Sequence, residues 1–166
     1  MKNLSELFEH ELKDLYSAEK QITSALPKVI DAASDASLKS SLQNHLQETQ
    51  GQVERLESIF SKLDIDGSGH KCKGMEGLVK ESDDFLKEDA TTSVRDAGII
   101  AACQRIEHYE IAGYGTAHHY AKELGHREIA ELLEQTLNEE KGADDRLNNL
   151  AIERLNKRAE HGGVEA

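Results

Sequence analysis

Glutamates at matching positions of a repeated pattern are the residues of this sequence best suited to chemistry. Glu19 and Glu110 each lie in the centre of an apolar stripe, three or four residues from the neighbouring members of that stripe. These two residues are 91 positions apart, as are Glu48 and Glu139, and Glu107 lies one helical turn before Glu110 on the same face. Buried carboxylates lose hydration and repel one another unless cations compensate them. Two divalent or trivalent metal ions would provide that compensation.

The positions of residues around each predicted helix add His45 to these candidates. They leave open whether Glu139 or Glu140 faces the core. His45 lies on an inward stripe one turn before Glu48, where it is either a metal ligand or a core histidine with its own partner. Glu139 lies at the edge of its stripe, whereas Glu140, with Asp144 one turn further on, lies nearer the centre. Carboxylate oxygens suit iron and manganese, and imidazole adds affinity for transition metals. The alternative, an ordinary solvated glutamate, is strongest for Glu48 and Glu139.

Four apolar stripes predict the long helices that must position these side chains. The stripes cover residues 4–33, 38–63, 93–124 and 129–155. Pro27 should kink the first helix without ending it, because the stripe continues in phase beyond it. Residues 34–37 predict a turn with an N-cap, and residues 64–74, with three glycines, predict a loop before a short helix at about 75–87.

Connection lengths predict the topology. Tight turns join the first helix to the second and the third to the fourth, which makes two antiparallel hairpins. Residues 61–92 separate the hairpins, as expected for an all-α, ferritin-like four-helix bundle with a long crossover containing a short extra helix. The apolar phases coincide when the chain is shifted by 91 residues, which indicates a duplicated hairpin, although any two amphipathic helices can be brought into phase. We expect one domain over residues 1–160 and a disordered tail over 161–166.

Composition restricts the classes of partner. The chain has 20 Lys and Arg against 32 Asp and Glu, a net charge of −12, which disfavours nucleic acid and anionic membranes. One proline, no tryptophan and 4% aromatic residues disfavour a β-sandwich or barrel. The longest apolar runs are too short to span a bilayer, and the first residues do not form a secretory signal. Two cysteines fit a reducing environment, so we expect a cytoplasmic protein.

Three other motifs give weaker signals. Residues 64–69 begin like an EF-hand loop, but Met75 occupies the position where a bidentate glutamate is needed. His70 and Cys72 lack further zinc ligands in their loop. His118 and its neighbour His119 point in different directions on a helix and do not chelate together. We therefore assign none of these motifs a site.

Several longer runs resemble the YciE/YciF family of bacterial stress proteins. The runs are residues 15–21, 45–52, 107–112 and 137–141, and the likeness covers nearly the whole chain in order. The resemblance implies a ferritin-like bundle, a cytoplasmic homodimer and an association with general or osmotic stress. It does not imply one particular reaction.

The wider ferritin-like group adds an expected ligand pattern. That group places Glu on the first and third helices and Glu-x-x-His on the second and fourth. Glu19 and Glu110 fit the first and third positions, and Glu107 together with Glu110 resembles the doubled glutamates of rubrerythrins. Both expected histidines are missing, because Gly51 and Gly142 follow Glu48 and Glu139 at the required spacing. His45, Gln52 or Asp144 are the possible replacements.

Together these observations predict a stress-associated protein with a di-iron or di-manganese carboxylate site. Such a site would reduce peroxide or oxygen, or would oxidise Fe(II). The alternative is a non-enzymatic structural or interaction protein with a relic site, which the missing histidines favour. A ferritin-type storage cage is the weakest hypothesis, since the resemblance implies a homodimer. The candidate ligands are Glu19, His45, Glu48, Glu107, Glu110, Glu139 and Glu140.

Overall fold

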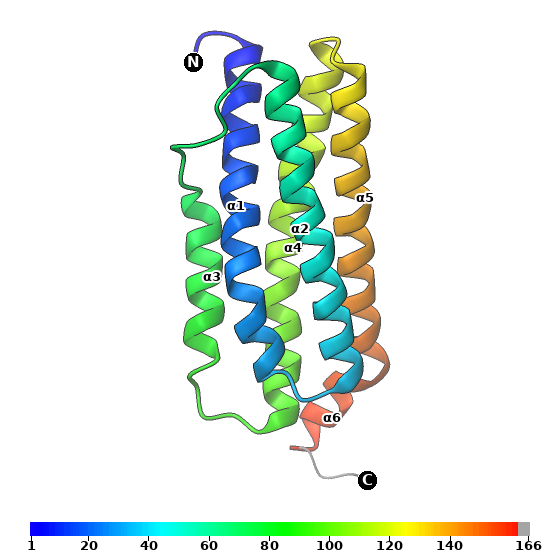
Figure 1. Cartoon of the computed structure of the whole chain (residues 1–166). Helices are drawn as coiled ribbons and strands as arrows, with labels where there is room; N and C mark the ends of the chain where they lie inside the picture. The colour runs from blue at the N-terminus through cyan, green and yellow to red at the C-terminus, as the bar shows by residue number, and fades with distance from the viewer. Residues whose placement is uncertain (163–166) are drawn as a thin grey trace.

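Helices make up all the regular structure that the computed structural model describes, which covers residues 1–162 (Figure 1). Four long helices lie side by side, and a shorter one packs against α1 and α4 on the outside of the bundle. The all-α bundle predicted from the apolar stripes is confirmed, and so is the short helix between the hairpins. The elements are α1 (Leu4–Ala32), α2 (Ala36–Leu63), α3 (Lys73–Phe85), α4 (Thr92–Glu123), α5 (Arg127–Leu150), a π-helical turn (Ala151–Leu155) and α6 (Asn156–Glu160).

Helix directions explain the long crossover. Residues 33–35 join α1 to α2, and residues 124–126 join α4 to α5, so that each pair is antiparallel. Helix α2 ends at the same end of the bundle at which α1 begins, whereas α4 starts at the opposite end (Figure 1). Residues 64–91 therefore run the length of the bundle, and α3 forms the middle of this return. None of the helices described is long and apolar enough to cross a membrane.

Two apolar clusters occupy opposite halves of the bundle and leave a polar layer between them. The cluster nearer the α1–α2 turn includes Ile22, Leu26, Leu42, Ile99 and Leu147. The cluster in the other half includes Leu12, Leu56, Ile59, Tyr114 and Leu133. Most buried polar residues of the long helices fall between the positions that supply these two clusters. The buried polar residues of this middle layer are Glu19, His45, Thr49, Gln52, Glu107, Glu110, Thr136 and Glu140.

Three local features refine the sequence predictions. Pro27 lies on an exposed face within α1, which continues to Ala32 as predicted. The last helical stripe does not remain α-helical, because residues 151–155 wind as a π-helix. Ala151 and Leu155 stay buried within this π-helical turn. Residues 161–162 form a turn, and the remainder of the predicted tail lies outside the described residues.

Asp35 links the α1–α2 turn to the π-helical turn and to α6. Its carboxylate accepts hydrogen bonds from the backbone N–H groups of Ser37 and Leu38 at the start of α2. Arg154 donates two hydrogen bonds to the same carboxylate, at 2.5 and 2.9 Å, and Arg158 donates one at 3.1 Å. Burial alone would raise the pKa of Asp35, but the guanidinium of Arg154 and the backbone donors lower it. This carboxylate is therefore both a helix cap and the anchor of the π-helical turn.

The Asp35→Ala substitution should lower the free energy of unfolding by about 2 kcal/mol, because it removes the cap and leaves two arginines without their shared partner. Urea unfolding followed by circular dichroism would measure the change. Asp31→Ala, on an exposed position of α1, is the matched control and should change stability little. Equal effects of the two substitutions would contradict the anchoring role.

Candidate metal centre

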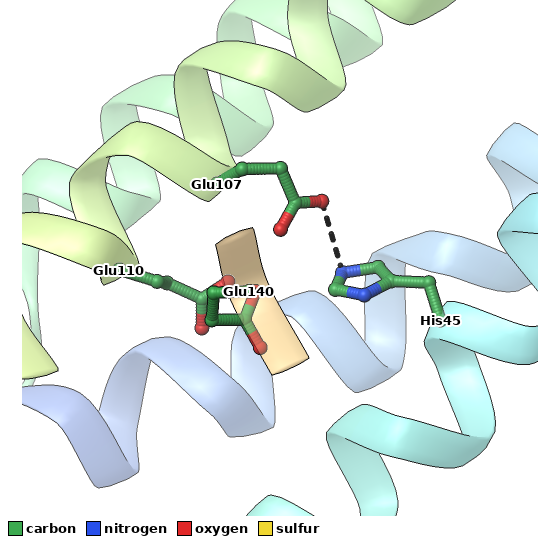
Figure 2. Close-up of side chains that lie close together, drawn as sticks. All are labelled: His45, Glu107, Glu110 and Glu140. Atoms are coloured by element: carbon green, nitrogen blue, oxygen red, sulfur yellow. Dashed lines mark ion pairs between the residues drawn. The ribbon is translucent and has the colours of Figure 1, made fainter. Parts of the chain in front are cut away.

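Four buried side chains from three helices meet in the polar layer. His45 comes from α2, Glu107 and Glu110 from α4, and Glu140 from α5 (Figure 2). Each offers one ligand atom, and these atoms all lie within 4.8 Å of one another. The Nε2 atom of His45 is 3.2 Å from Oε1 of Glu107. One imidazole and three carboxylates at this separation can hold a metal ion.

Glu19 brings a fourth carboxylate to this layer from α1. Its side chain is completely buried, and its Oε1 accepts a hydrogen bond from the hydroxyl of Tyr114. Burial raises the pKa of Glu19, and the charge of Glu140 raises it further. The pKa of Glu110 is also raised by burial first, and then by the charges of Glu140 and Glu19. Glu19 is therefore electrostatically part of the cluster, although it lies outside the four-residue group.

Unpartnered ligand atoms are the strongest chemical feature of the layer. Within the described residues, both oxygens of Glu110 and both ring nitrogens of His45 are buried without a hydrogen-bond partner. One carboxylate oxygen each of Glu19, Glu107 and Glu140 is in the same condition. Leaving a buried polar atom unsatisfied costs about 1–3 kcal/mol. A cation would satisfy one atom of each of the four clustered side chains at once, so the donor set fits a bound metal.

Protonation is the other way in which these carboxylates avoid mutual repulsion. Burial raises the pKa of Glu107, and the neighbouring Glu140 carboxyl group raises it further. With Glu19 and Glu110 also shifted upward, the metal-free layer favours uncharged carboxyl groups. A cation would reverse these shifts, because it stabilises the ionised form.

Glu48 and Glu139 lie outside the cluster and form ion pairs instead. Arg146 donates to Glu48 at 2.6 Å, and Arg55 binds Glu139 through two hydrogen bonds of 2.9 Å. Both glutamates are half-buried at the α2–α5 contact. Arg55 and Arg146 are themselves 91 positions apart, so the two pairs are repeats of one ion pair. The spacing that suggested repeated ligands thus arises from a repeated salt bridge.

Glu48 still has a connection to the cluster through His45. Its Oε2 is 3.9 Å from Nδ1 of His45, while Nε2 of the same ring faces Glu107. The neighbouring His45 ring and the charge of Arg146 lower the pKa of Glu48, against a smaller opposite effect of burial. A carboxylate behind the distal nitrogen of a ligating histidine commonly fixes the ring orientation. Glu48 is placed to do this for His45.

The Glu-x-x-His spacing expected of ferritin-like proteins falls one residue before the inward-facing positions of α2 and α5. A Cβ built at Gly51 would contact nothing within 4 Å, so this position points to open space. The inward residues are instead Thr49 and Gln52 on α2 and Glu140 and Ala143 on α5. A histidine at residue 51 would therefore not face the cluster.

Two other polar contacts complete the account of the candidate residues. Gln52 donates to Glu140, and also to Glu139 at 3.1 Å, so it supports the cluster. Asp144 accepts from Gln104 at 3.2 Å and pairs with His108 at 3.2 Å, away from the four-residue group. Tyr114 was not predicted as a partner of Glu19. Its position one turn after Glu110 on the same stripe was the available signal.

Comparisons with known proteins match nearly the whole chain. The family model described as "Domain of unknown function (DUF892)" matches residues 3–160. Protein YciF of Escherichia coli K12 is 45% identical over 162 residues, which is 97% of this chain and 98% of the relative.

Solved structures give the same result. The crystal structure of the E. coli stress protein YciF is similar with a TM-score of 0.91 and 44% identity, covering 95% of this chain and 99% of that one. YcfI from Rhodopseudomonas palustris is similar with a TM-score of 0.87 and 47% identity, covering 89% and 94%. A protein from Xanthomonas campestris shares the fold alone, with a TM-score of 0.75 and 20% identity, covering 95% and 99%.

Proposed function

This chain belongs to the DUF892 family, and we propose that it is a stress-associated protein whose bundle binds a pair of iron or manganese ions. The observation that carries this proposal is the set of buried, unpartnered nitrogen and oxygen atoms in the polar layer. The association with stress rests on the similarity to the E. coli stress protein YciF. By the family resemblance, the protein acts in the cytoplasm as a homodimer.

The proposed ligands come from the compact cluster and from Glu19 beside it. His45, Glu107, Glu110 and Glu140 form the cluster, and the charge of Glu140 raises the pKa of Glu19. These five side chains would hold the two ions. When bound, two such ions supply the two electrons needed to reduce peroxide or dioxygen, and the same site would oxidise Fe(II) as a substrate. Glu48 would hold the His45 ring, and Tyr114 would hold Glu19.

The second candidate function is a non-enzymatic structural role with a relic site. It is favoured by the donor set itself, which has four carboxylates but a single imidazole, and by Thr49 at the position equivalent to Glu140. In this case the raised pKa values would keep the layer uncharged without a metal.

Metal binding separates the two functions. Metal-free protein titrated anaerobically with Fe(II) or Mn(II) and then desalted should retain roughly two ions per chain by elemental analysis. Hydrogen peroxide should then oxidise the bound Fe(II) faster than it oxidises the same Fe(II) free in buffer. Retention of one ion would reduce the proposal to a mononuclear site, and retention of none would favour the structural role.

A further inference from the structure

A narrow cavity reaches the His45 and Glu107 edge of the proposed metal centre. Its volume is about 20 Å³, close to the roughly 10–15 Å³ that a single water needs by the same kind of measure. We call it the passage, and His45 and Glu107 are among its lining residues. Apolar side chains form most of its wall, including Ile22, Leu26, Val29, Cys103 and Ile106.

An open groove on the surface adjoins this passage. The groove has a volume of about 650 Å³ and lies between α1, residues 67–71 of the crossover and α3. Ala25, Val79 and Asp83 line both the groove and the passage. These three residues, called the gate below, mark where the surface groove narrows toward the buried cluster. Because α3 lies on the outside of α1 (Figure 1), the crossover helix forms part of the gate.

Charge and size limit what can use this path. Lys20, Lys28 and Lys71 line the groove, and Lys28 pairs with Asp83 at the gate at 2.5 Å. These charges are largely compensated, but a hydrated divalent cation would have to lose water against the apolar walls of the passage. A neutral molecule with two heavy atoms does not bear this cost. The path therefore suits a small uncharged oxidant better than the metal itself.

We propose that the groove, the gate and the passage form the access route by which dioxygen or hydrogen peroxide reaches the metal centre. The inference rests on the proposed function, and it adds the route of the substrate. Reduction of peroxide would take two electrons from the bound ions and two protons from solvent, and cleavage of the O–O bond would give two waters. Reduction of dioxygen by the same two electrons and two protons would give hydrogen peroxide.

Metal-free protein provides a test that does not depend on the redox activity. Dissolved dioxygen is paramagnetic, so it shifts the NMR signals of the methyl groups that it approaches. The methyls of Ile22, Val29 and Ile106 in the passage should shift several-fold more than those of Ile59 and Leu133 in the other apolar cluster, and Ile22 is the matched comparison because it is as deeply buried as these two. Equal shifts in the two sets would show that the passage does not admit dioxygen, and would overturn the route for that oxidant.

Substitutions at the gate test the route in the metal-loaded protein. Val79→Phe narrows the gate and should slow Fe(II) oxidation by about tenfold, whereas Val79→Ala should accelerate it. Lys80→Phe places the same ring on the adjacent exposed position of α3 and should leave the rate unchanged. Separate stopped-flow measurements with dioxygen and with hydrogen peroxide identify which oxidant uses the route. All variants should retain the parent's metal content.

The outcomes distinguish failure of the route from failure of the proposed function. If the parent oxidises Fe(II) and neither Val79 variant differs from Lys80→Phe, the route is wrong and the metal site stands. If the parent binds no metal, the proposed function fails, and the methyl shifts still decide whether the passage admits dioxygen. If Val79→Phe proves misfolded by circular dichroism, the acceleration expected for Val79→Ala decides the question.

Discussion

Glu110→Gln should raise the free energy of unfolding of the metal-free protein at pH 7 by about 1–3 kcal/mol, the usual cost of a buried polar group without a partner. Burial and the charges of Glu140 and Glu19 raise the pKa of Glu110 well above its ordinary value, so folding favours the uptake of a proton. Glutamine has nearly the same shape and is already uncharged. The substitution therefore removes the cost of protonation while leaving the packing unchanged.

The pH dependence gives the sign of this effect. A carboxyl group whose folded pKa is raised stabilises the fold fully below its unfolded pKa, and that contribution is lost as the pH rises toward the folded pKa. Metal-free protein should therefore lose stability above about pH 4.5, and Glu110→Gln should show a shallower loss. Glu19 and Glu107 have the same direction of shift, so part of the slope should remain. Urea unfolding in the presence of a chelator from pH 4.5 to 8 measures both slopes.

Glu48→Gln is the matched control, because the same substitution there should act in the opposite direction. The pKa of Glu48 is lowered by His45 and Arg146, so its charge stabilises the fold at neutral pH and is lost on acidification. Glu48→Gln should lower stability at pH 7. Parallel behaviour of the two variants would mean that Glu110 is not a buried, repelled carboxylate.

The sequence was sufficient for the fold because apolar spacing and connection length are local properties. Stripes with steps of three and four fix the helices, and a crossover of the observed length leaves few ways to arrange two hairpins. The central positions of Glu19 and Glu110 followed from the same stripes, and both side chains are fully buried. The π-helical turn could not be predicted, since its residues keep the helical spacing.

Residues at the edges of the apolar stripes were harder to assign to the core or to the surface. Residues there lie about equally close to the core and to solvent, and tertiary partners decide between the two. The arginines at residues 55 and 146 hold Glu139 and Glu48 at the α2–α5 contact, which leaves Glu140 to face the cluster. Arg55 and Arg146 show the same 91-residue spacing as Glu48 and Glu139, and this coincidence would have indicated a repeated ion pair. The repeat therefore supports duplication of the hairpin but does not define a symmetric ligand set.

Metal should raise the melting temperature of the parent protein by about 10 °C when its concentration is roughly a thousand times Kd, because it binds only the folded state. Glu140→Gln should remove most of this rise. The substitution keeps the shape of the side chain, and its carbonyl can still accept from Gln52, so the expected loss is specific to the charge at the cluster. Calorimetry with Mn(II) and with a chelator measures the difference for each variant.

Glu139→Gln separates ligand binding from general electrostatics, because the substitution is identical and lies one residue away. Glu139 pairs with Arg55 and lies outside the four-residue cluster, so its replacement should lower the melting temperature in the chelator but preserve the rise on adding metal. A large loss of the metal-induced rise in Glu139→Gln, with little loss in Glu140→Gln, would place the ligand on the other face of α5. Equal losses would indicate attraction of the metal to the acidic bundle as a whole, because both substitutions remove one negative charge.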